Sequence, residues 1–444
     1  MYGLTCLIEG AMASQQNWYK LDNVAKIIPS SVEGADTRVM RLTCELKEEV
    51  DPVLLQEALD MAMPEFPHLN CCLRRGVFWY YLDNWRGTPE IMEETIPALS
   101  SLYTPGHRDL LFRVMYYGKR INLEMFHVLA DGTGGFVFLV HILTHYLSEK
   151  YGLDYGELAQ DLSSVTEKEE DAFSQFYEGR KLRKINNRKP VRKNFIKEMF
   201  PVKAYQIKGH MDEDLRQHLI EGTVPTGKLL EVAHGYQVTV GVLIVSLYVE
   251  AMMTQITARE RRRPIVVSVP VNLRQYFPSA TTRNFYGAIQ IRFDPAAYQG
   301  TLESILTEIQ KGFMENLTEE NMFNTMNGYA ALEHNYAIKM TPLVLKYWGI
   351  RGYNNLVKQG VTTSVSNIGK VELPEAMRQY VSKFAAFMAS RTAFLCLTSF
   401  GDKTVFGITS CFTEHTVFMH FFRRLTRLGI PVELTTNDYD REGV

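Results

Sequence analysis

Apolar and polar residues alternate along several short stretches of the first half of the chain, and this period of two predicts β-strands. The expected strands cover residues 37–46, 77–82, 110–117 and 120–127. In the last of them, one face of the pleat carries Ile121, Leu123, Met125 and His127. The histidine therefore points to the same side as the apolar residues.

Two stretches of the first half have a helical period, one between the first two strands and one after the last strand. Asp51 followed by Pro52 marks a helix start, because Asp caps the free backbone amides and Pro is preorganised for the first helical position, so a helix is expected over 51–63. A second helix is expected over 135–149, directly after a glycine-rich turn. We expect the turn glycines to adopt positive φ angles.

The second half predicts a degenerate repeat of the same plan. A strand is expected over 205–209, a helix over 212–221, a strand over 403–412 and a helix over 414–428. Between the halves the chain becomes strongly charged and loses its period. A length of 444 residues favours two domains. We therefore expect an α/β chain with halves at 1–164 and 201–444, joined by a charged linker at 165–200.

The most informative motif is His127 followed by Asp131 and Gly132 at the end of the strand over 120–127. A neutral imidazole can take a proton from an alcohol, amine or thiol when its ring is fixed beside a pocket. The alternative is a core histidine followed by an ordinary Asp-Gly turn, with Asp131 or Thr133 capping the next helix. The residues alone leave both interpretations open.

The His-x-x-x-Asp-Gly motif resembles the signature of the chloramphenicol acetyltransferase-like acyltransferase superfamily, which includes alcohol acetyltransferases and condensation domains. Two further segments occur in the order used by that superfamily, namely residues 269–274 followed by 284–287, and residues 363–369, while residues 18–22 and 50–67 resemble the alcohol acetyltransferases. The branch that they resemble most is that of the alcohol acetyltransferases. The resemblance implies two α/β sandwich domains that form a pseudo-dimer, with one active site between them.

The same resemblance assigns roles to individual residues. His127 is the expected general base, Ser366 the expected oxyanion donor, and Gly132 a structural residue of the turn. Asp131 is expected to form an ion pair with Arg274 of the second half. Expected substrate-binding residues are Asn284, Gly287 and Asn367. A departure from the family pattern is Phe126, which stands where a second histidine is usual.

Several residues also have a purely structural interpretation. Arg274 can be a surface residue at a strand end, and Ser366 with Asn367 can be a turn that closes a strand. His141 and His145 have the i, i+4 spacing of a zinc site, but no acidic or cysteine ligand is near them in sequence, so core histidines and no metal are expected.

Composition excludes some partners. The net charge of −2 gives no reason to expect nucleic acid. The six cysteines lack metal-ligand spacing and mostly lie in apolar runs, which predicts buried free thiols in a reducing compartment. The apolar run over 238–253 is too short for a transmembrane helix, and residues 1–12 do not resemble a signal peptide. A cytoplasmic location is therefore expected.

The predicted function is transfer of an acyl group, acetyl in the first instance, from acyl-CoA to a small-molecule alcohol by direct attack. Acyl-CoA is then a co-substrate, and no tightly bound cofactor is expected. One alternative takes the acyl group from a phosphopantetheinyl carrier protein, for which the basic run over 181–193 could be a dock. The other is a relative that binds without catalysing.

Overall fold

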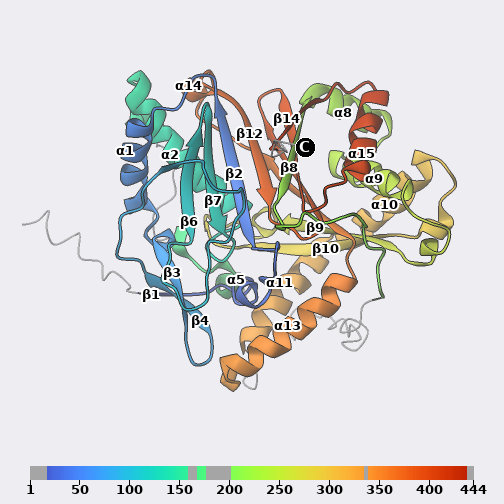
Figure 1. Ribbon diagram of the computed structural model, residues 1–444, viewed down its shortest axis with the longest axis horizontal. Helices are drawn as coiled ribbons and strands as arrows, with labels where there is room; N and C mark the ends of the chain where they lie inside the picture. Colours follow the sequence, from blue (N-terminus) through green and yellow to red (C-terminus); the bar gives the residue numbers. More distant parts are fainter. Residues whose placement is uncertain (1–17, 159–167, 177–201, 335–338, 438–444) are drawn as a thin grey trace, which may run out of the picture.

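The computed structural model describes residues 18–158, 168–176, 202–334 and 339–437. Within these ranges the chain forms two large sheets, one small sheet and the helices that cover them (Figure 1). The small sheet has the order β1-β4-β3 and is formed by β1 (Trp18–Lys20), β3 (Cys71–Arg75) and β4 (Tyr80–Asn84).

The five-stranded sheet has the order β12-β2-β7-β6-β5. Its strands are β2 (Val39–Leu46), β5 (Met92–Glu93), β6 (Phe112–Tyr117), β7 (Arg120–Phe126) and β12 (Val381–Met388). The helices α1 (Pro52–Ala62) and α2 (Gly132–Tyr151) pack together beside it, and α3 (Tyr155–Leu158) and α5 (Ala172–Phe176) follow along the chain. Asp51 caps α1 by accepting hydrogen bonds from the amides of Val53 and Leu54, as its sequence predicts.

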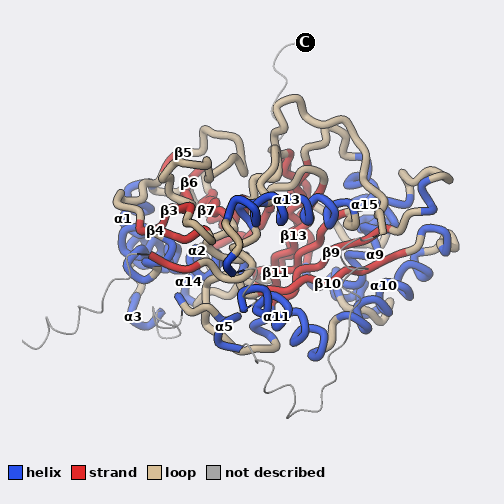
Figure 2. The backbone as a smooth tube through the Cα atoms, turned by 90° about the horizontal axis from the view of Figure 1, so that it is seen from below, coloured by secondary structure: helices blue, strands red, loops and turns tan. Residues whose placement is uncertain are grey.

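The seven-stranded sheet has the order β10-β9-β11-β13-β14-β8-β15. Its strands are β8 (His218–Pro225), β9 (Ile265–Asn272), β10 (Tyr286–Phe293), β11 (Thr363–Lys370), β13 (Ala393–Phe400), β14 (Lys403–Ser410) and β15 (Glu433–Thr436). The helices of this half are α8 (Thr226–Gly235), α9 (Val240–Met253), α10 (Leu302–Asn316), α11 (Glu319–His334), α13 (Leu343–Gln359), α14 (Glu375–Arg378) and α15 (Thr416–Arg427). Figure 2 shows the two large sheets side by side, with helices on their outer surfaces.

The two halves repeat one plan. In the first, β2, β7 and β6 are adjacent and antiparallel, with α1 packed against α2. In the second, β8, β14 and β13 are adjacent and antiparallel, with α9 packed against α15. The internal repeat expected from the sequence is therefore present in the sheet topology.

The start of the second copy differs from the prediction. No strand forms over 205–209, and residues 218–225 form strand β8 where the sequence predicted a helix over 212–221. Asp212 caps only a turn, accepting hydrogen bonds from the amides of Asp214 and Arg216. Strand β8 pairs with β14 on one side and β15 on the other, so partners distant in sequence decide its conformation.

One strand crosses between the halves. Strand β12 lies beyond residue 380 but pairs with β2 in the five-stranded sheet, while its neighbours along the chain belong to the seven-stranded sheet. The predicted linker at 165–200 falls mostly outside the described residues. Its described part, residues 168–176, contributes the buried side chains of Lys168 and Phe173.

The cysteines and the apolar helix behave as their sequence suggests. The thiols of Cys44, Cys71, Cys72, Cys396 and Cys411 are free and buried, and Cys6 lies outside the described residues. Among the described residues no single helix is long and apolar enough to cross a membrane, and only α8 and α9 together, bent by 83°, reach that length and composition. Most side chains of α9 are buried.

Candidate active site

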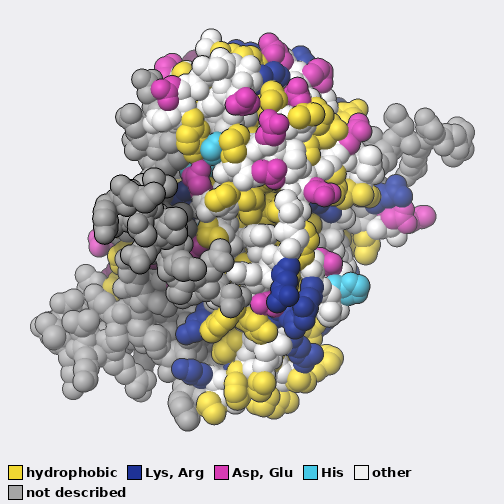
Figure 3. Space-filling model, turned by 90° about the vertical axis from the view of Figure 1, so that its left-hand side faces the viewer, with side chains coloured by type: hydrophobic (Ala, Val, Ile, Leu, Met, Phe, Trp, Pro, Cys, Tyr) yellow, Lys and Arg dark blue, Asp and Glu magenta, His cyan; other side chains and the backbone are white. Residues whose placement is uncertain are grey.

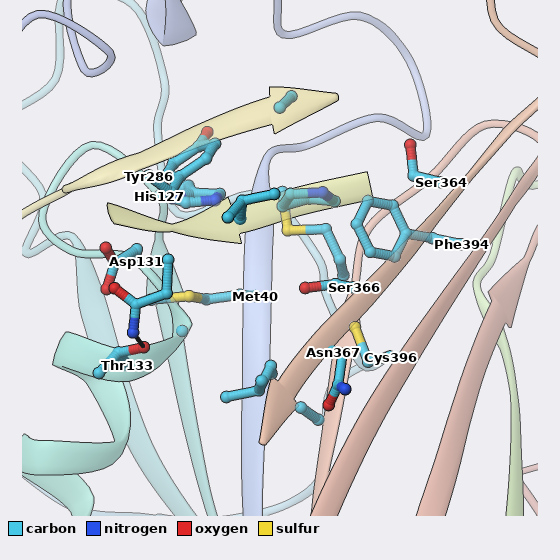
Figure 4. Close-up of a pocket in the computed structure, with 18 of the residues that line it drawn as sticks. Met40, His127, Asp131, Thr133, Tyr286, Ser364, Ser366, Asn367, Phe394 and Cys396 are labelled. Atoms are coloured by element: carbon cyan, nitrogen blue, oxygen red, sulfur yellow. Dashed lines mark hydrogen bonds between the residues drawn. The ribbon is translucent and has the colours of Figure 1, made fainter. Parts of the chain in front are cut away.

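A cavity of about 330 Å³ lies between the two large sheets (Figure 4). Strands β2 and β12 of the five-stranded sheet line one side of it, and strands β9, β10, β11 and β13 of the seven-stranded sheet line the other. The lining combines apolar residues with polar groups that can orient a ligand, as small-molecule sites do. The polar and titratable members include Arg38, His127, Asp131, Thr133, Ser268, Asn272, Tyr286, Ser364, Ser366 and Asn367.

His127 lies directly after β7 and borders this cavity. Its backbone amide donates to the carbonyl oxygen of Arg38 at 2.9 Å, and its ring atom Nδ1 is 2.9 Å from the carbonyl oxygen of Ala130. A carbonyl can only accept, so Nδ1 carries the proton and Nε2 remains an acceptor. The ring is therefore held in the tautomer that a general base requires.

The electrostatics around His127 favour the neutral ring. Burial lowers the pKa of His127 below its ordinary value, and the negative charge of Asp131 only partly opposes this effect. The ring of Tyr286 faces it with 5.4 Å between the ring centres. A neutral imidazole beside a cavity can accept a proton from a bound nucleophile.

Asp131 does not bind the His127 ring. One carboxylate oxygen caps α2 by accepting from the amide of Gly134 at 2.9 Å, and the other accepts from the amide of Phe285 at 2.9 Å. This second oxygen also accepts from Nη1 of Arg274 at 2.8 Å. The ion pair expected between Asp131 and Arg274 is thus present, and it joins the N-terminus of α2 to the second half of the chain.

The Arg274 guanidinium has partners on several sides. It donates to the carbonyl oxygens of Thr281 and Arg283 and to the side-chain oxygen of Asn272, in addition to Asp131. A buried ion pair persists only where further hydrogen bonds satisfy both groups. Arg274 therefore ties the loop before β10 to the turn that follows His127.

The glycines of the turn serve close packing, and the prediction of positive φ angles there was wrong. Helix α2 begins at Gly132, earlier than the expected position 135. A Cβ atom at Gly134 would lie 1.8 Å from the carbonyl oxygen of Thr282, and one at Gly132 would lie 3.3 Å from Ile368. The absence of a side chain lets the second half approach the helix end.

Ser366 and Asn367 lie on β11 and line the cavity, together with Ser364. Figure 4 shows the Ser366 hydroxyl directed into the cavity, between Met40 and Cys396. The strand does not end at this pair, as the sequence suggested, but continues to Lys370 through an irregularity in its pairing with β13.

Asn284 and Gly287 are not among the residues that line this cavity, and their expected role in binding substrate stays a prediction. The side-chain amide of Asn284 is buried and donates to the carbonyl oxygen of His127 at 3.0 Å and to Asp22 at 3.1 Å. Burial raises the pKa of Asp22 to about 6. Gly287 faces Thr325, which lies 3.0 Å from the position of its missing Cβ. Asn284 thus fixes the backbone of His127 through a hydrogen bond, from a position outside the cavity.

The polar residues of the cavity that sequence reasoning missed include Tyr286 and Arg38. Tyr286 stands inside a motif segment and alternates with Phe285, so pleat periodicity could have indicated that it faces away from the buried phenylalanine. Arg38 adopts a left-handed conformation, with φ of 57°, just before β2. No sequence pattern singled it out.

The two histidines of α2 share a carboxylate that is distant in sequence. His141 Nδ1 lies 2.9 Å and His145 Nε2 3.2 Å from the oxygens of Glu65, which Lys168 also approaches at 3.5 Å. Burial raises the pKa of Glu65, but hydrogen bonds from His141, His145 and Tyr155 outweigh this and lower it. In the described part of the chain no group of His, Cys, Asp and Glu residues is arranged to hold a metal ion.

Several solved structures have the same fold as this chain. A trichothecene 15-O-acetyltransferase (TRI3) from Fusarium sporotrichioides matches 92% of this chain and 94% of its own, with 11% identity and a TM-score of 0.60. The chain has the fold of that protein. F. graminearum TRI101, solved with ethyl coenzyme A, matches 92% of this chain and 97% of its own, with 10% identity and a TM-score of 0.60.

The first condensation domain of the CDA synthetase has the same fold, matching 93% of this chain and 96% of its own, with 13% identity and a TM-score of 0.59. No family model and no curated protein sequence matches the chain. The structure confirms the two-domain α/β fold expected from the short motifs. The sequence identities to these structures are only 10–13%.

Proposed function

We propose that this protein is an acyltransferase that moves an acyl group, acetyl in the first instance, from acyl-CoA to the hydroxyl of a small-molecule alcohol. The observation that carries the proposal is the state of His127. Its Nδ1 proton is held by the carbonyl oxygen of Ala130, and its ring borders a cavity between the two halves. Nε2 is then available to a nucleophile bound in that cavity.

The proposed reaction has two steps. Nε2 of His127 takes the proton of the alcohol as the alcohol oxygen attacks the thioester carbonyl carbon, and a tetrahedral oxyanion forms. The Ser366 hydroxyl donates a hydrogen bond to that oxyanion. The intermediate collapses, the carbon–sulfur bond breaks, and the departing thiolate of CoA takes the proton from His127.

Other residues hold this arrangement. Asp131, Gly132 and Arg274 fix the turn after His127 against the second half, and Asn284 fixes the His127 carbonyl. Asn367, which borders the cavity, is proposed to contact substrate. We propose no metal and no tightly bound cofactor, and a cytoplasmic location where free acyl-CoA is the co-substrate.

Solved structures with the same fold support the choice of acyl-CoA as the acyl donor. One structure of F. graminearum TRI101 contains ethyl coenzyme A, and one of F. sporotrichioides TRI101 contains coenzyme A and T-2. The starter condensation domain of the rhizomide synthetase, also similar in fold, was solved with C8-CoA at a TM-score of 0.55 and 12% identity. A CoA thioester is therefore our choice of donor for this chain.

The test is the release of free CoA thiol from acetyl-CoA in the presence of a panel of alcohols. We expect release that depends on the alcohol in wild type and nearly vanishes in His127→Ala, because positioned base catalysis contributes about 10²–10⁴-fold. His234→Ala is the matched control, since His234 is exposed on α8. Retention of more than about a tenth of the wild-type turnover in His127→Ala would contradict the role of the base.

A second candidate takes the acyl group from a phosphopantetheinyl carrier protein, because condensation domains share this fold. The basic run over 181–193 that could dock such a carrier lies outside the described residues. The comparison is kcat/KM for one acyl group presented on CoA and on carrier proteins, at low and high salt. A carrier advantage of about 100-fold, or about 2.7 kcal/mol, that collapses in salt would favour this candidate.

A third possibility is a binding relative without catalysis. It predicts that CoA thioesters bind wild type and His127→Ala equally, and that neither protein releases thiol with any alcohol. The neutral, oriented imidazole argues against it, because simple binding gives no reason to fix one tautomer of His127.

A further inference from the structure

Large apolar side chains are exposed at the end of the molecule where α13 meets the turn between β3 and β4, at the bottom of Figure 1. Their exposure is high, reaching 73% for Val77, 63% for Leu345 and 67% for Trp348. We call this the α13–hairpin surface, and it consists of Trp18, Val77, Phe78, Val344, Leu345 and Trp348. Contiguous exposed apolar side chains of this kind mark an interaction site.

The two segments form one surface because hydrogen bonds join them. The amide of Leu343, at the start of α13, donates to the carbonyl oxygen of Val77 at 2.9 Å. The ammonium of Lys346 donates to the carbonyl oxygen of Phe78 at 3.0 Å and lies 3.6 Å from the centre of the Trp79 ring. The helix is therefore fixed against the hairpin turn.

Helix geometry directs the apolar residues outward. Val344 and Trp348 are four positions apart, and Leu345 and Trp348 are three apart, so these three side chains share one face of α13. The opposite face carries Leu343 and Lys346, which are buried against the hairpin. The helix thus exposes one apolar face while another is already used for packing.

The charge of both segments has one sign. Residues 334–371 contain no Asp or Glu but include Lys339, Lys346, Arg351, Lys358 and Lys370, and residues 66–82 contain no Asp or Glu but include Arg74 and Arg75. Arg351 and Lys358 are paired with Glu33, whereas Lys339 and Arg75 are exposed. Figure 3 shows hydrophobic side chains gathered at the lower end of one face, with Lys and Arg side chains above them.

We propose that the α13–hairpin surface docks on the anionic face of a lipid bilayer. Trp348 and Trp18 suit the boundary between head groups and acyl chains, while Leu345 and Val77 enter the outer acyl region. Lysine and arginine at the edge attract the negative lipid head groups. Of the acidic residues beside these segments, Glu33 is paired with Arg351 and Lys358, and Asp83 lies opposite Trp18 in the small sheet.

The partner of the α13–hairpin surface is a membrane rather than an acidic protein, because the apolar side chains of this surface project outward into solvent. They stand on the outer face of a helix and at a hairpin turn, at one end of the molecule. A cytoplasmic location, as proposed above, would present the protein with leaflets that carry anionic lipid. This proposal is independent of the acyl-transfer chemistry, since it concerns a different surface.

The experiment is flotation of the purified full chain with vesicles of phosphatidylcholine alone and of phosphatidylcholine mixed with phosphatidylserine. We expect binding to the anionic vesicles only, weakened by high salt. The double variant Leu345→Ala/Trp348→Ala should lower the partition coefficient by about ten-fold or more, because the membrane-facing apolar area is lost. A melting curve checks that both proteins are folded.

The matched control is Tyr117→Ala/Met314→Ala, which removes two apolar side chains of similar exposure from other surfaces, 65% each. It should bind vesicles as wild type does. A second readout is quenching of tryptophan fluorescence by brominated lipid, which should fall when Trp348 is replaced by Phe. Absence of wild-type binding to anionic vesicles overturns the proposal, as does an equal loss in the control. Binding of the Leu345→Ala/Trp348→Ala variant at wild-type strength overturns it as well.

Discussion

The Nδ1 atom of His127 lies 2.9 Å from the carbonyl oxygen of Ala130, three residues further along the chain. The ring is thus oriented by its own turn and not by a carboxylate. Asp131, the acidic residue of the motif, is instead occupied by Arg274, Gly134 and Phe285. The two residues of the motif therefore have different tasks. His127 borders the cavity, whereas Asp131 joins the two halves of the chain through Arg274.

The first prediction concerns pH. Burial lowers the pKa of His127, so the base stays neutral to more acidic pH than a free histidine. We expect kcat/KM for acyl transfer to be level at neutral pH and to fall with a slope of one below the ordinary histidine pKa of about 6.5. Samples returned to neutral pH should recover full activity, which separates protonation from unfolding. A loss of kcat/KM with its midpoint above that pH would contradict the lowered pKa of His127.

The second prediction is that Asp131 and Arg274 stabilise the protein as one unit. Their side chains are only 7% and 12% exposed, so truncation of either to Ala leaves the other charge buried and unpaired. Each single variant should lower the free energy of unfolding by roughly 3–5 kcal/mol. In a double-mutant cycle measured by urea unfolding, the two effects should not add. Strict additivity would show that the residues act independently.

The third prediction tests the tight approach at the helix start. Gly134→Ala places a Cβ atom on the carbonyl oxygen of Thr282, so a backbone shift is required and stability should fall by about 1–3 kcal/mol. Gly349→Ala is the control, because nothing lies within 4 Å of its Cβ position in α13. That variant should be unchanged or more stable by up to about 1 kcal/mol. Equal melting temperatures for the two variants would refute the packing argument.

The fourth prediction separates two serines on one strand. Ser366→Ala should lower kcat by about 10²–10³-fold if its hydroxyl donates to the oxyanion. Ser364→Ala is the matched control, because Ser364 lies two residues away on β11 and lines the same cavity. Its loss should affect KM more than kcat. A similar small effect for both serines would assign the oxyanion to another donor.

Local sequence predicted much of the first half. Asp51 with Pro52 located the start of α1, and the alternation after Arg120 located β7 to within one residue. These signals succeed because caps and pleat periodicity depend on neighbours in sequence. The helix predicted over 212–221 failed for the opposite reason, since strand β8 is defined by its partners β14 and β15.

The candidate site divides in the same way. The motif identified His127, Asp131 and Gly132, and resemblance supplied Arg274 and Ser366 from far along the chain. Arg38 entered the site only through tertiary structure, and Asn284 proved to lie outside the cavity, bonded to the backbone of His127. Their positions depend on how the two large sheets face each other.

The sequence by itself therefore determined the elements with strong local signals, the histidine turn, and the doubled plan of the chain. Tertiary structure alone decided that β12 crosses into the first sheet and that Glu65 meets His141 and His145. The physical reason is the range of the interactions. Caps and periodicity act within a few residues, whereas strand order, buried charge partners and cavity shape arise from contacts between segments that only packing brings together.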